Sequence, residues 1–160
     1  MPHPLAAEVV QLLIDHGLTV ATAETDTGGL IGSWFTDVAG SSKAFLGGAT
    51  PYSNPPKIKV LSVPHETLKS EGSVSEATAL ALAHGARTTF NVDIAVAETG
   101  VTGPTGGSDV NPVGTVWIAC VGPSDRVVTE RHVWTGDRET NKRETVLRAF
   151  ALVQAAAESG

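Results

Sequence analysis

The stretch TVATAETDTGGLIGSWF, residues 19–35, decides the fold that this sequence predicts. It opens with Thr19–Ala23, which is short, β-branched and apolar, as is typical of a buried strand. Two glycines, Gly28 and Gly29, then allow a tight turn. From Leu30 onward the apolar residues recur at helical spacing. A strand, a glycine-containing turn and a helix in this order indicate an α/β protein.

Hydrophobic periodicity and Gly or Pro breaks divide the rest of the chain in the same way. The other expected strands are Phe45–Tyr52, Val92–Ala97, Val113–Val121 and Arg126–Trp134. The other expected helices are one that starts at Pro4, then Lys57–Leu61, Pro64–Ser70, Ala77–Phe90 (capped by Ser73 or Ser75) and Arg138–Ala157. Helices alternate with buried strands early, and a hairpin comes late. We therefore expect one domain over residues 1–160, a three-layer α/β/α sandwich with a mixed sheet.

The composition argues against several classes of function. The formal net charge is −6 and the 11 Lys and Arg are scattered, whereas nucleic-acid binding needs a basic stripe. The one cysteine, Cys120, can form no disulfide within the chain, and the 5 histidines lack metal-binding spacing, so we expect no metal and no cofactor. No signal-peptide pattern and no membrane-length apolar stretch is present. We expect a cytoplasmic protein with no nucleic-acid and no membrane partner.

Seven short motifs, in order along the chain, resemble one known family. They are AETDTGG (23–29), GSS (40–42), YSNPPK (52–57), EGSVS (71–75), TGVTGPTGG (99–107), PVGTV (112–116) and GDR (136–138). On these motifs the chain resembles the CinA C-terminal domain family, the nicotinamide-mononucleotide deamidase family. The resemblance runs roughly from Leu18 to Leu152.

The resemblance implies an α/β/α fold and a homo-oligomer, a dimer or larger. It also implies hydrolysis of the carboxamide of nicotinamide mononucleotide, which yields nicotinic acid mononucleotide and ammonia. The expected partner is therefore a small-molecule nucleotide substrate, and no cofactor is needed.

Amide hydrolysis needs a nucleophile, a group that removes its proton, and donors for the developing oxyanion. The sequence has no suitable cysteine and no triad-like histidine, so a hydroxyl paired with a lysine is the natural candidate. In the family a Ser/Lys pair is expected to do this work. Lys57 matches the family lysine, and the family serine corresponds by position to Thr25.

Two further residues are catalytic candidates through the resemblance. Ser42 is a family site position that could replace Thr25 as nucleophile if it lies near Lys57, although it could equally be an ordinary loop hydroxyl. Tyr52 matches a family tyrosine that could stack on the pyridine ring or donate to the carboxamide. It could also be a strand tyrosine packed in the sheet.

The glycine-rich stretch 99–108 is the expected substrate-binding loop. Its backbone N–H groups can approach a ligand closely and form an anion-binding nest. Thr99 lies at the end of a buried strand, where open α/β sheets bind ligands. Arg138 could pair with a phosphate in a bidentate way, or could be an exposed arginine. The substrate-binding candidates are Thr99, Gly100, Gly103, Gly106, Gly107 and Arg138.

The chain departs from the family pattern near this site. Thr25 keeps a hydroxyl but adds a methyl group that stiffens χ1 in a tight turn. Asp26 stands where the family has cysteine, and it is expected to cap the following helix. Glu98 and Thr102 change the usual neighbours of the glycine-rich loop. Three functions stay open: an active amidohydrolase, an impaired member that acts as a nucleotide-binding module, and a structural or interaction protein.

Overall fold

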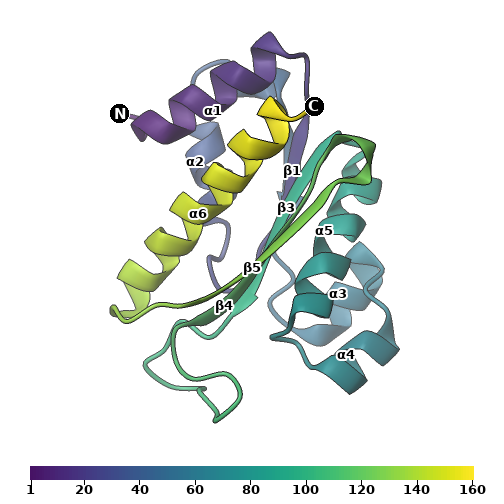
Figure 1. Cartoon of the computed structure of the whole chain (residues 1–160), viewed down its shortest axis with the longest axis vertical. Helices are drawn as coiled ribbons and strands as arrows, with labels where there is room; N and C mark the ends of the chain where they lie inside the picture. The colour runs from purple at the N-terminus through teal and green to yellow at the C-terminus, as the bar shows by residue number, and fades with distance from the viewer.

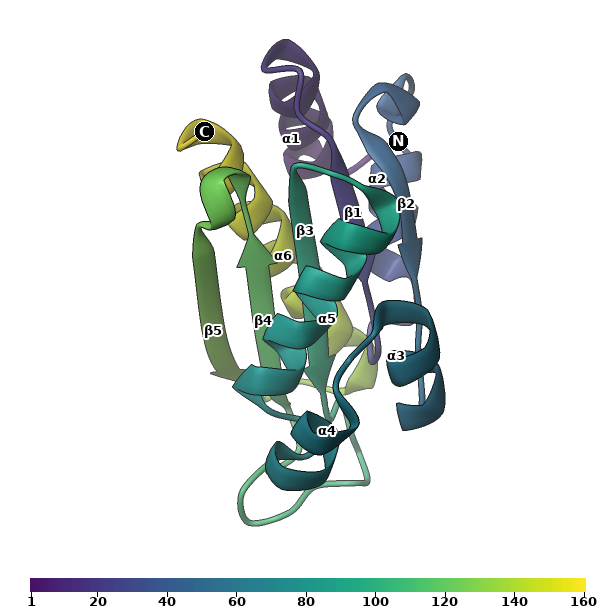
Figure 2. The same ribbon diagram turned by 90° about the vertical axis from the view of Figure 1, so that its right-hand side faces the viewer.

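A computed structural model describes all residues, 1–160. Helices and strands follow one another along the chain as shown in Figures 1 and 2. The order is α1 (Pro4–Asp15), β1 (Val20–Ala23), α2 (Leu30–Thr36), η1 (Ser41–Lys43), β2 (Phe45–Ala49), α3 (Asn54–Leu61), α4 (His65–Glu71), α5 (Glu76–Phe90), β3 (Ile94–Gly100), β4 (Thr115–Val121), η2 (Pro123–Asp125), β5 (Val127–Val133) and α6 (Arg138–Glu158).

The five strands form one mixed sheet in the order β2-β1-β3-β4-β5. The first three strands in this order, β2, β1 and β3, are parallel, whereas β4 and β5 continue the sheet as antiparallel neighbours. The carboxyl ends of β1, β2 and β3 therefore lie at the same edge. At that edge the glycine-rich loop extends beyond the sheet in both views (Figures 1 and 2).

Helices cover both faces of the sheet, which confirms the predicted three-layer sandwich. One face packs against α1, α2 and α6 around bulky side chains such as Phe35 and Phe150. The other face packs against α5, with α3 and α4 beside it, and its strand residues are mostly alanines, including Ala21, Ala95 and Ala119. Because successive strand residues point to opposite faces, small and large residues alternate along the central strands. The small side chains let α5 lie close to the sheet.

The boundaries of some elements differ from the prediction. Helix α3 starts at Asn54 rather than Lys57, because Pro55 falls in its first turn, where the missing N–H costs nothing. Strand β3 continues to Gly100, past the predicted end at Ala97, because β4 pairs with it along this length. Of the two proposed caps of α5, Ser75 is the one that accepts the N–H of a first-turn residue.

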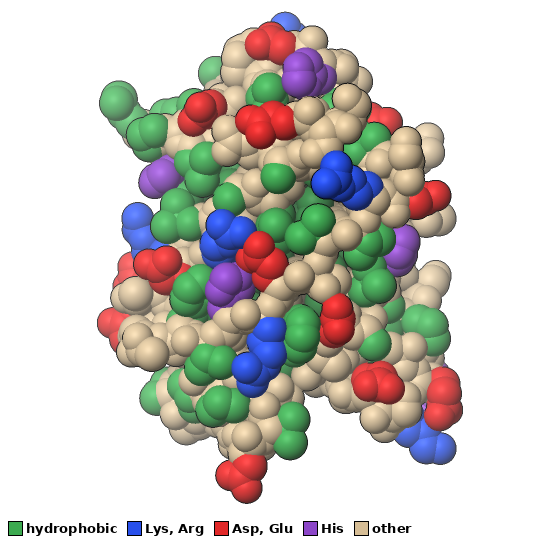
Figure 3. Space-filling view, viewed as in Figure 1, with side chains coloured by type: hydrophobic (Ala, Val, Ile, Leu, Met, Phe, Trp, Pro, Cys, Tyr) green, Lys and Arg blue, Asp and Glu red, His purple; other side chains and the backbone are tan.

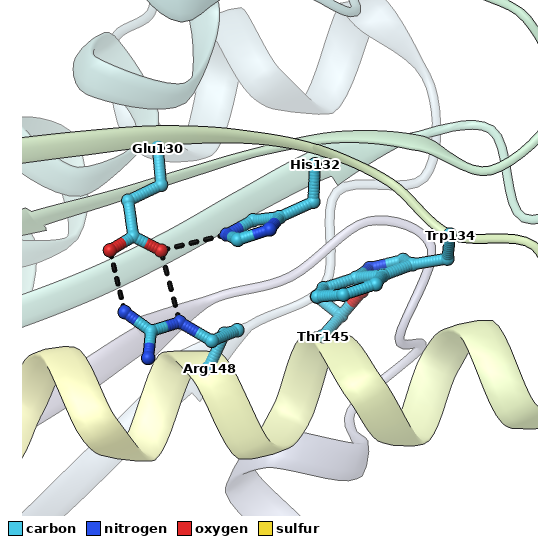
Figure 4. A network of polar contacts seen from close by, with 5 residues as sticks. All are labelled: Glu130, His132, Trp134, Thr145 and Arg148. Atoms are coloured by element: carbon cyan, nitrogen blue, oxygen red, sulfur yellow. Dashed lines mark hydrogen bonds and ion pairs between the residues drawn. The ribbon is translucent and has the colours of Figure 1, made fainter.

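The edge strand β5 is joined to α6 by polar contacts (Figure 4). Arg148 of α6 donates to both carboxylate oxygens of Glu130, at 3.0 and 2.6 Å. His132 lies 2.7 Å from the same carboxylate and stacks on Trp134 at a ring distance of 4.5 Å. The indole N–H of Trp134 donates to the Thr145 hydroxyl at 3.0 Å. These contacts fix the position of α6, whose first turn reaches the candidate site.

None of the helices has both the length and the apolar character needed to cross a bilayer.

Candidate functional site

The turn after β1 is built around the buried carboxylate of Glu24. Its oxygens accept the N–H groups of Gly29, Ile31 and Gly32 at 3.1, 2.9 and 2.8 Å, the free N–H groups at the start of α2. Asp26 was expected to cap this helix, and that expectation is wrong. The N-cap residue is Gly29, which has no side chain, and Glu24 does the capping from the end of the strand.

A second buried carboxyl, Glu98, reaches the same turn from β3. Its Oε1 accepts the N–H of Thr25 at 2.6 Å, and the N–H and hydroxyl of Thr27 at 3.0 and 2.8 Å. Glu98 has no exposed surface. Burial, and then the charge of Asp26, raise the pKa of Glu98 to about 7, while the hydrogen bonds from Thr27 and Thr25 oppose the shift. The carboxyl therefore changes charge near neutral pH.

The hydroxyl of Thr25, the candidate nucleophile, faces Glu98. Its Oγ1 lies 3.1 Å from the Glu98 backbone carbonyl oxygen and 3.4 Å from Glu98 Oε2. The residue is buried. The threonine is thus held from both its N–H and its hydroxyl by one glutamate, in a narrow space at the carboxyl end of β1.

Asp26 and Lys57 form the charged part of the site. One carboxylate oxygen of Asp26, Oδ2, is buried and has no hydrogen-bond partner. Burial raises the pKa of Asp26 to about 6, although a backbone hydrogen bond from Thr102 and the charges of Arg138, Lys57 and Lys142 oppose the shift. A carboxyl in this position can meet a polar group of a ligand.

Lys57 is buried at the start of α3, and its pKa is lowered by that burial against the opposing charges of Asp26 and Glu98. Its Nζ donates to Asn54 Oδ1 at 3.4 Å and forms no hydrogen bond with Thr25. A lysine with a lowered pKa exchanges protons more readily near neutral pH. In this structure the Thr25 hydroxyl bonds to Glu98 instead.

Arg138 links Tyr52 to the glycine-rich loop. Its guanidinium donates to the Gly103 carbonyl at 2.9 Å and to the Tyr52 hydroxyl at 3.2 Å. Tyr52 is 64% exposed, so it does not pack inside the sheet as its alternative interpretation required. The arginine and the tyrosine form a rim beside Asp26, open to a ligand.

The glycine-rich loop is shaped by close packing at one end and is exposed at the other. A Cβ at Gly100 would lie 2.6 Å from the Thr115 carbonyl oxygen, so this glycine lets β3 approach β4. Gly103, at φ +83°, leaves no room for a Cβ beside Val113. Gly106 and Gly107 are exposed.

The hydroxyl of Thr99 is used within the protein. It donates to the Ser73 carbonyl oxygen at 2.6 Å, and the residue is buried. A substrate-binding hydroxyl would need a free donor or an exposed oxygen. Thr99 therefore acts on the site by holding the segment before α5 against the end of β3.

Ser42 lies away from the other candidates. It is exposed in η1, directly before β2, whereas Lys57 and Thr25 follow the carboxyl ends of β2 and β1. Because these strands are parallel, their two ends lie at opposite edges of the sheet. Within the chain, the condition that Ser42 lies near Lys57 is not met.

A pocket of about 400 Å³ opens between α2 and the first turns of α6. Arg138 lines this pocket together with two cations that the sequence analysis did not predict, Lys142 and Arg143. The other lining residues are Leu30, Trp34 and Glu139. Arg143 lies over the Trp34 ring at 6.0 Å from its centroid. The spacing of Arg138 and Lys142, four residues apart on a predicted helix, was the signal that could have found the pocket. Three cations around one hollow suit a phosphate.

No three His, Cys, Asp or Glu side chains converge closely enough to hold a metal ion.

The family model described as the CinA C-terminal domain matches residues 2–157. This chain belongs to the CinA C-terminal domain family. The Escherichia coli K12 protein named nicotinamide-nucleotide amidohydrolase PncC is 41% identical over 148 residues, which cover 92% of this chain and 88% of that protein. A CinA-like protein of Chlorobaculum tepidum is 46% identical over 154 residues, 90% of this chain but 36% of the relative. The chain thus spans about a third of the length of the first CinA-like relatives.

Solved structures of the CinA family share the fold over nearly the full length. A CinA superfamily protein of Klebsiella pneumoniae superposes with a TM-score of 0.92 at 33% identity and covers 98% of this chain and 97% of its own. The competence/damage inducible protein CihA of Agrobacterium tumefaciens has a TM-score of 0.91 at 36% identity, with 98% of each chain covered. The mixed sheet and its helices are therefore those of the CinA family.

Proposed function

We propose that this chain hydrolyses the carboxamide of nicotinamide mononucleotide to nicotinic acid mononucleotide and ammonia. The observation that carries the proposal is one juxtaposition. A hydroxyl, a buried lysine and an unpartnered carboxylate oxygen, from Thr25, Lys57 and Asp26, lie at the carboxyl edge of the parallel strands, and Arg138 extends from there into a cationic pocket. The similarity to a relative named nicotinamide-nucleotide amidohydrolase supports the choice of substrate.

The pocket would hold the phosphate end of the nucleotide. Arg138, Lys142 and Arg143 supply the charge, and the guanidinium of Arg138 can bind two phosphate oxygens at once. The pocket volume of about 400 Å³ lies within the range of small-molecule sites. Tyr52, whose hydroxyl accepts from Arg138, would then lie beside the pyridine ring, and the carboxamide would point toward Thr25.

The protein groups at the reacting end have complementary roles. Thr25 supplies the nucleophilic oxygen, and Lys57 moves a proton, which its lowered pKa favours. The free Oδ2 of Asp26 accepts an N–H of the carboxamide, which selects an amide over the product carboxylate because like charges repel.

The test is ammonia release from nicotinamide mononucleotide by the purified wild-type protein. Lys57→Ala is expected to lose turnover while its circular dichroism stays native. The matched control is Lys59→Ala, because Lys59 is exposed on the same helix and should be dispensable. Turnover that survives in Lys57→Ala would remove the lysine from the mechanism.

A nucleotide-binding module is a second candidate function, and one observation favours it. The Thr25 hydroxyl is bonded to Glu98 and forms no hydrogen bond with Lys57, so the nucleophile and the lysine do not form the hydrogen-bonded pair that the family resemblance implies. A wild type that releases no ammonia but melts at higher temperature with rising nucleotide concentration would establish this function instead.

We also propose a cytoplasmic location and a homo-oligomeric assembly of this one domain. The free, buried thiol of Cys120 fits a reducing compartment. Apolar and charged side chains mix on the face shown in Figure 3, and the edge strand β5 leaves Val127, Val128 and Val133 about 40% exposed. Light scattering after size-exclusion chromatography would measure the assembly.

A further inference from the structure

Glu98 is the only ionisable side chain within hydrogen-bonding distance of the candidate nucleophile. Its Oε2 lies 3.4 Å from Thr25 Oγ1, and its backbone carbonyl orients the same hydroxyl from 3.1 Å. Lys57, the base expected from the family resemblance, bonds only to Asn54. Of the two acceptors next to the Thr25 hydroxyl, the backbone carbonyl at 3.1 Å cannot take up its proton, whereas the carboxylate at 3.4 Å can.

The network around Glu98 also holds a shared proton. The single hydroxyl proton of Thr27 lies between Glu24 Oε2 at 2.6 Å and Glu98 Oε1 at 2.8 Å. The hydroxyl donates to only one of these oxygens, and each of them also accepts two backbone N–H groups, so a proton on Glu98 belongs on its other oxygen, Oε2. Glu24 and Glu98 are both buried, where two adjacent negative charges are costly. Glu98, whose pKa is raised by this burial, can hold a proton here without a change in the fold.

We propose that Glu98 is the general base that removes the proton of the Thr25 hydroxyl, and that Lys57 is the acid that protonates the departing nitrogen. The proposal rests on the amidohydrolase function above and assigns the two proton transfers within it. Two departures from the family pattern then work together: Glu98 activates Thr25, which stands at the position of the family serine.

The proposed reaction forms an ester on Thr25 and then hydrolyses it. The Thr25 O–H bond breaks, its proton moves to Glu98 Oε2, and its oxygen bonds to the carboxamide carbon while the C=O electrons move onto oxygen. The carbonyl re-forms as the C–N bond breaks, and the nitrogen takes a proton from Lys57 and leaves as ammonia. Water then attacks the ester and returns a proton to Lys57, and the Thr25 oxygen leaves with the proton held by Glu98.

The charges facing Glu98 suit this role. Glu24 and Asp26 approach it from the turn after β1, and the ammonium of Lys57 approaches from α3. Burial and Asp26 raise the pKa of Glu98 to about 7, and a base whose pKa lies near the working pH is the most efficient. Burial lowers the pKa of Lys57, which makes it a better acid.

The experiment compares the pH profile of kcat/KM for wild type and Glu98→Gln. The wild-type rate should rise with pH through a midpoint near 7 and fall again at higher pH, where Lys57 loses the proton that it donates. Glu98→Gln keeps the side-chain shape but not the base, so kcat should fall about 10²- to 10⁴-fold and the rise near neutral pH should vanish. Glu8→Gln is the control, because Glu8 is exposed on α1, and it should keep the profile. The proposal would be overturned if Glu98→Gln keeps the wild-type pH profile and a kcat within about threefold of the wild-type value.

A second readout separates this proposal from the choice of substrate. An aryl sulfonyl fluoride reacts with an activated hydroxyl, and mass spectrometry measures its attachment to Thr25. Labelling should accelerate through neutral pH in the wild type, slow at least about 10²-fold in Glu98→Gln, and keep its pH dependence in Glu98→Asp, which retains a carboxylate. If Thr25 is labelled as expected but nicotinamide mononucleotide is not turned over, the proposed substrate is wrong and the assignment of Glu98 as the base stands. If wild type and Glu98→Gln are labelled equally fast, or if Thr25 is not labelled at all, Glu98 is not the general base for Thr25.

Discussion

Gly85 of α5 controls the position of Lys57, because α5 packs against the end of α3 at this glycine. A Cβ at Gly85 would lie 2.9 Å from the carbonyl carbon and 3.0 Å from the Cβ of Leu61, with the carbonyl oxygen closer still. Carbon atoms pack at about 3.5–4.0 Å, so Gly85→Ala must push the end of α3 away by about 1 Å. Lys57 precedes Leu61 by one helical turn and lies on the same face. The displacement therefore carries the lysine with it.

The expected magnitudes follow from this displacement. Overpacking costs about 1–3 kcal/mol, and the better helix propensity of alanine returns up to about 1 kcal/mol. The net loss of about 1–2 kcal/mol should lower the melting temperature by roughly 2–8 °C for a chain of this size. A 1 Å displacement of Lys57 should lower kcat about 10²-fold.

Differential scanning calorimetry and ammonia release measure the two effects. His84→Ala is the matched control, because His84 is exposed at the neighbouring position and alanine meets no obstacle there. Wild-type turnover in Gly85→Ala, with the higher melting temperature that alanine gives in an ordinary helix, would refute the packing argument.

The remaining predictions concern charge and the nucleophile. Arg138→Ala should raise KM for nicotinamide mononucleotide at least about 10-fold with a smaller change in kcat; an unchanged KM in steady-state kinetics would place the phosphate elsewhere. The pKa of Asp26 is raised from 3.8 to about 6, so its charged form lowers stability as pH rises through this range, and Asp26→Asn should melt a few degrees above wild type at pH 8 but not at pH 3. Thr25→Ser should increase ammonia release several-fold, because serine lacks the crowding methyl group; no gain would locate the limitation elsewhere. The contact with Arg148 lowers the pKa of Glu130, so its contribution is present above the ordinary value of 4.5 and lost in acid; Glu130→Gln should lower the unfolding free energy by about 1 kcal/mol at pH 7, and equal urea midpoints at pH 7 would contradict this.

Most of the fold was readable from local patterns. Helix and strand periods differ, so residues 19–35 predict a strand and a helix without reference to the rest of the chain. The short turn between β4 and β5 also predicts that these two strands pair in an antiparallel way. Helix α3 starts at Asn54, before the predicted Lys57, because the two prolines that end the preceding extended segment lie inside its first turn.

The site was predicted less completely, because its contacts join residues far apart in sequence. Glu98 bonds to the N–H of Thr25 across 73 positions, and no local pattern shows that pairing. The capping of α2 by Glu24 in place of Asp26 depends on the direction in which each side chain leaves the turn. The separation of Ser42 from Lys57 depends on the parallel register of β1 and β2.

The sequence by itself determined the alternation of strands and helices, the glycine positions that its turns need, and the resemblance to the CinA family. These follow from hydrophobic period and backbone sterics, which act over a few residues. Only the tertiary structure decided which carboxyl meets which hydroxyl, and which cations surround the pocket. Pairings of that kind depend on where each strand ends at the edge of the sheet, and that position is set by the packing of the whole core.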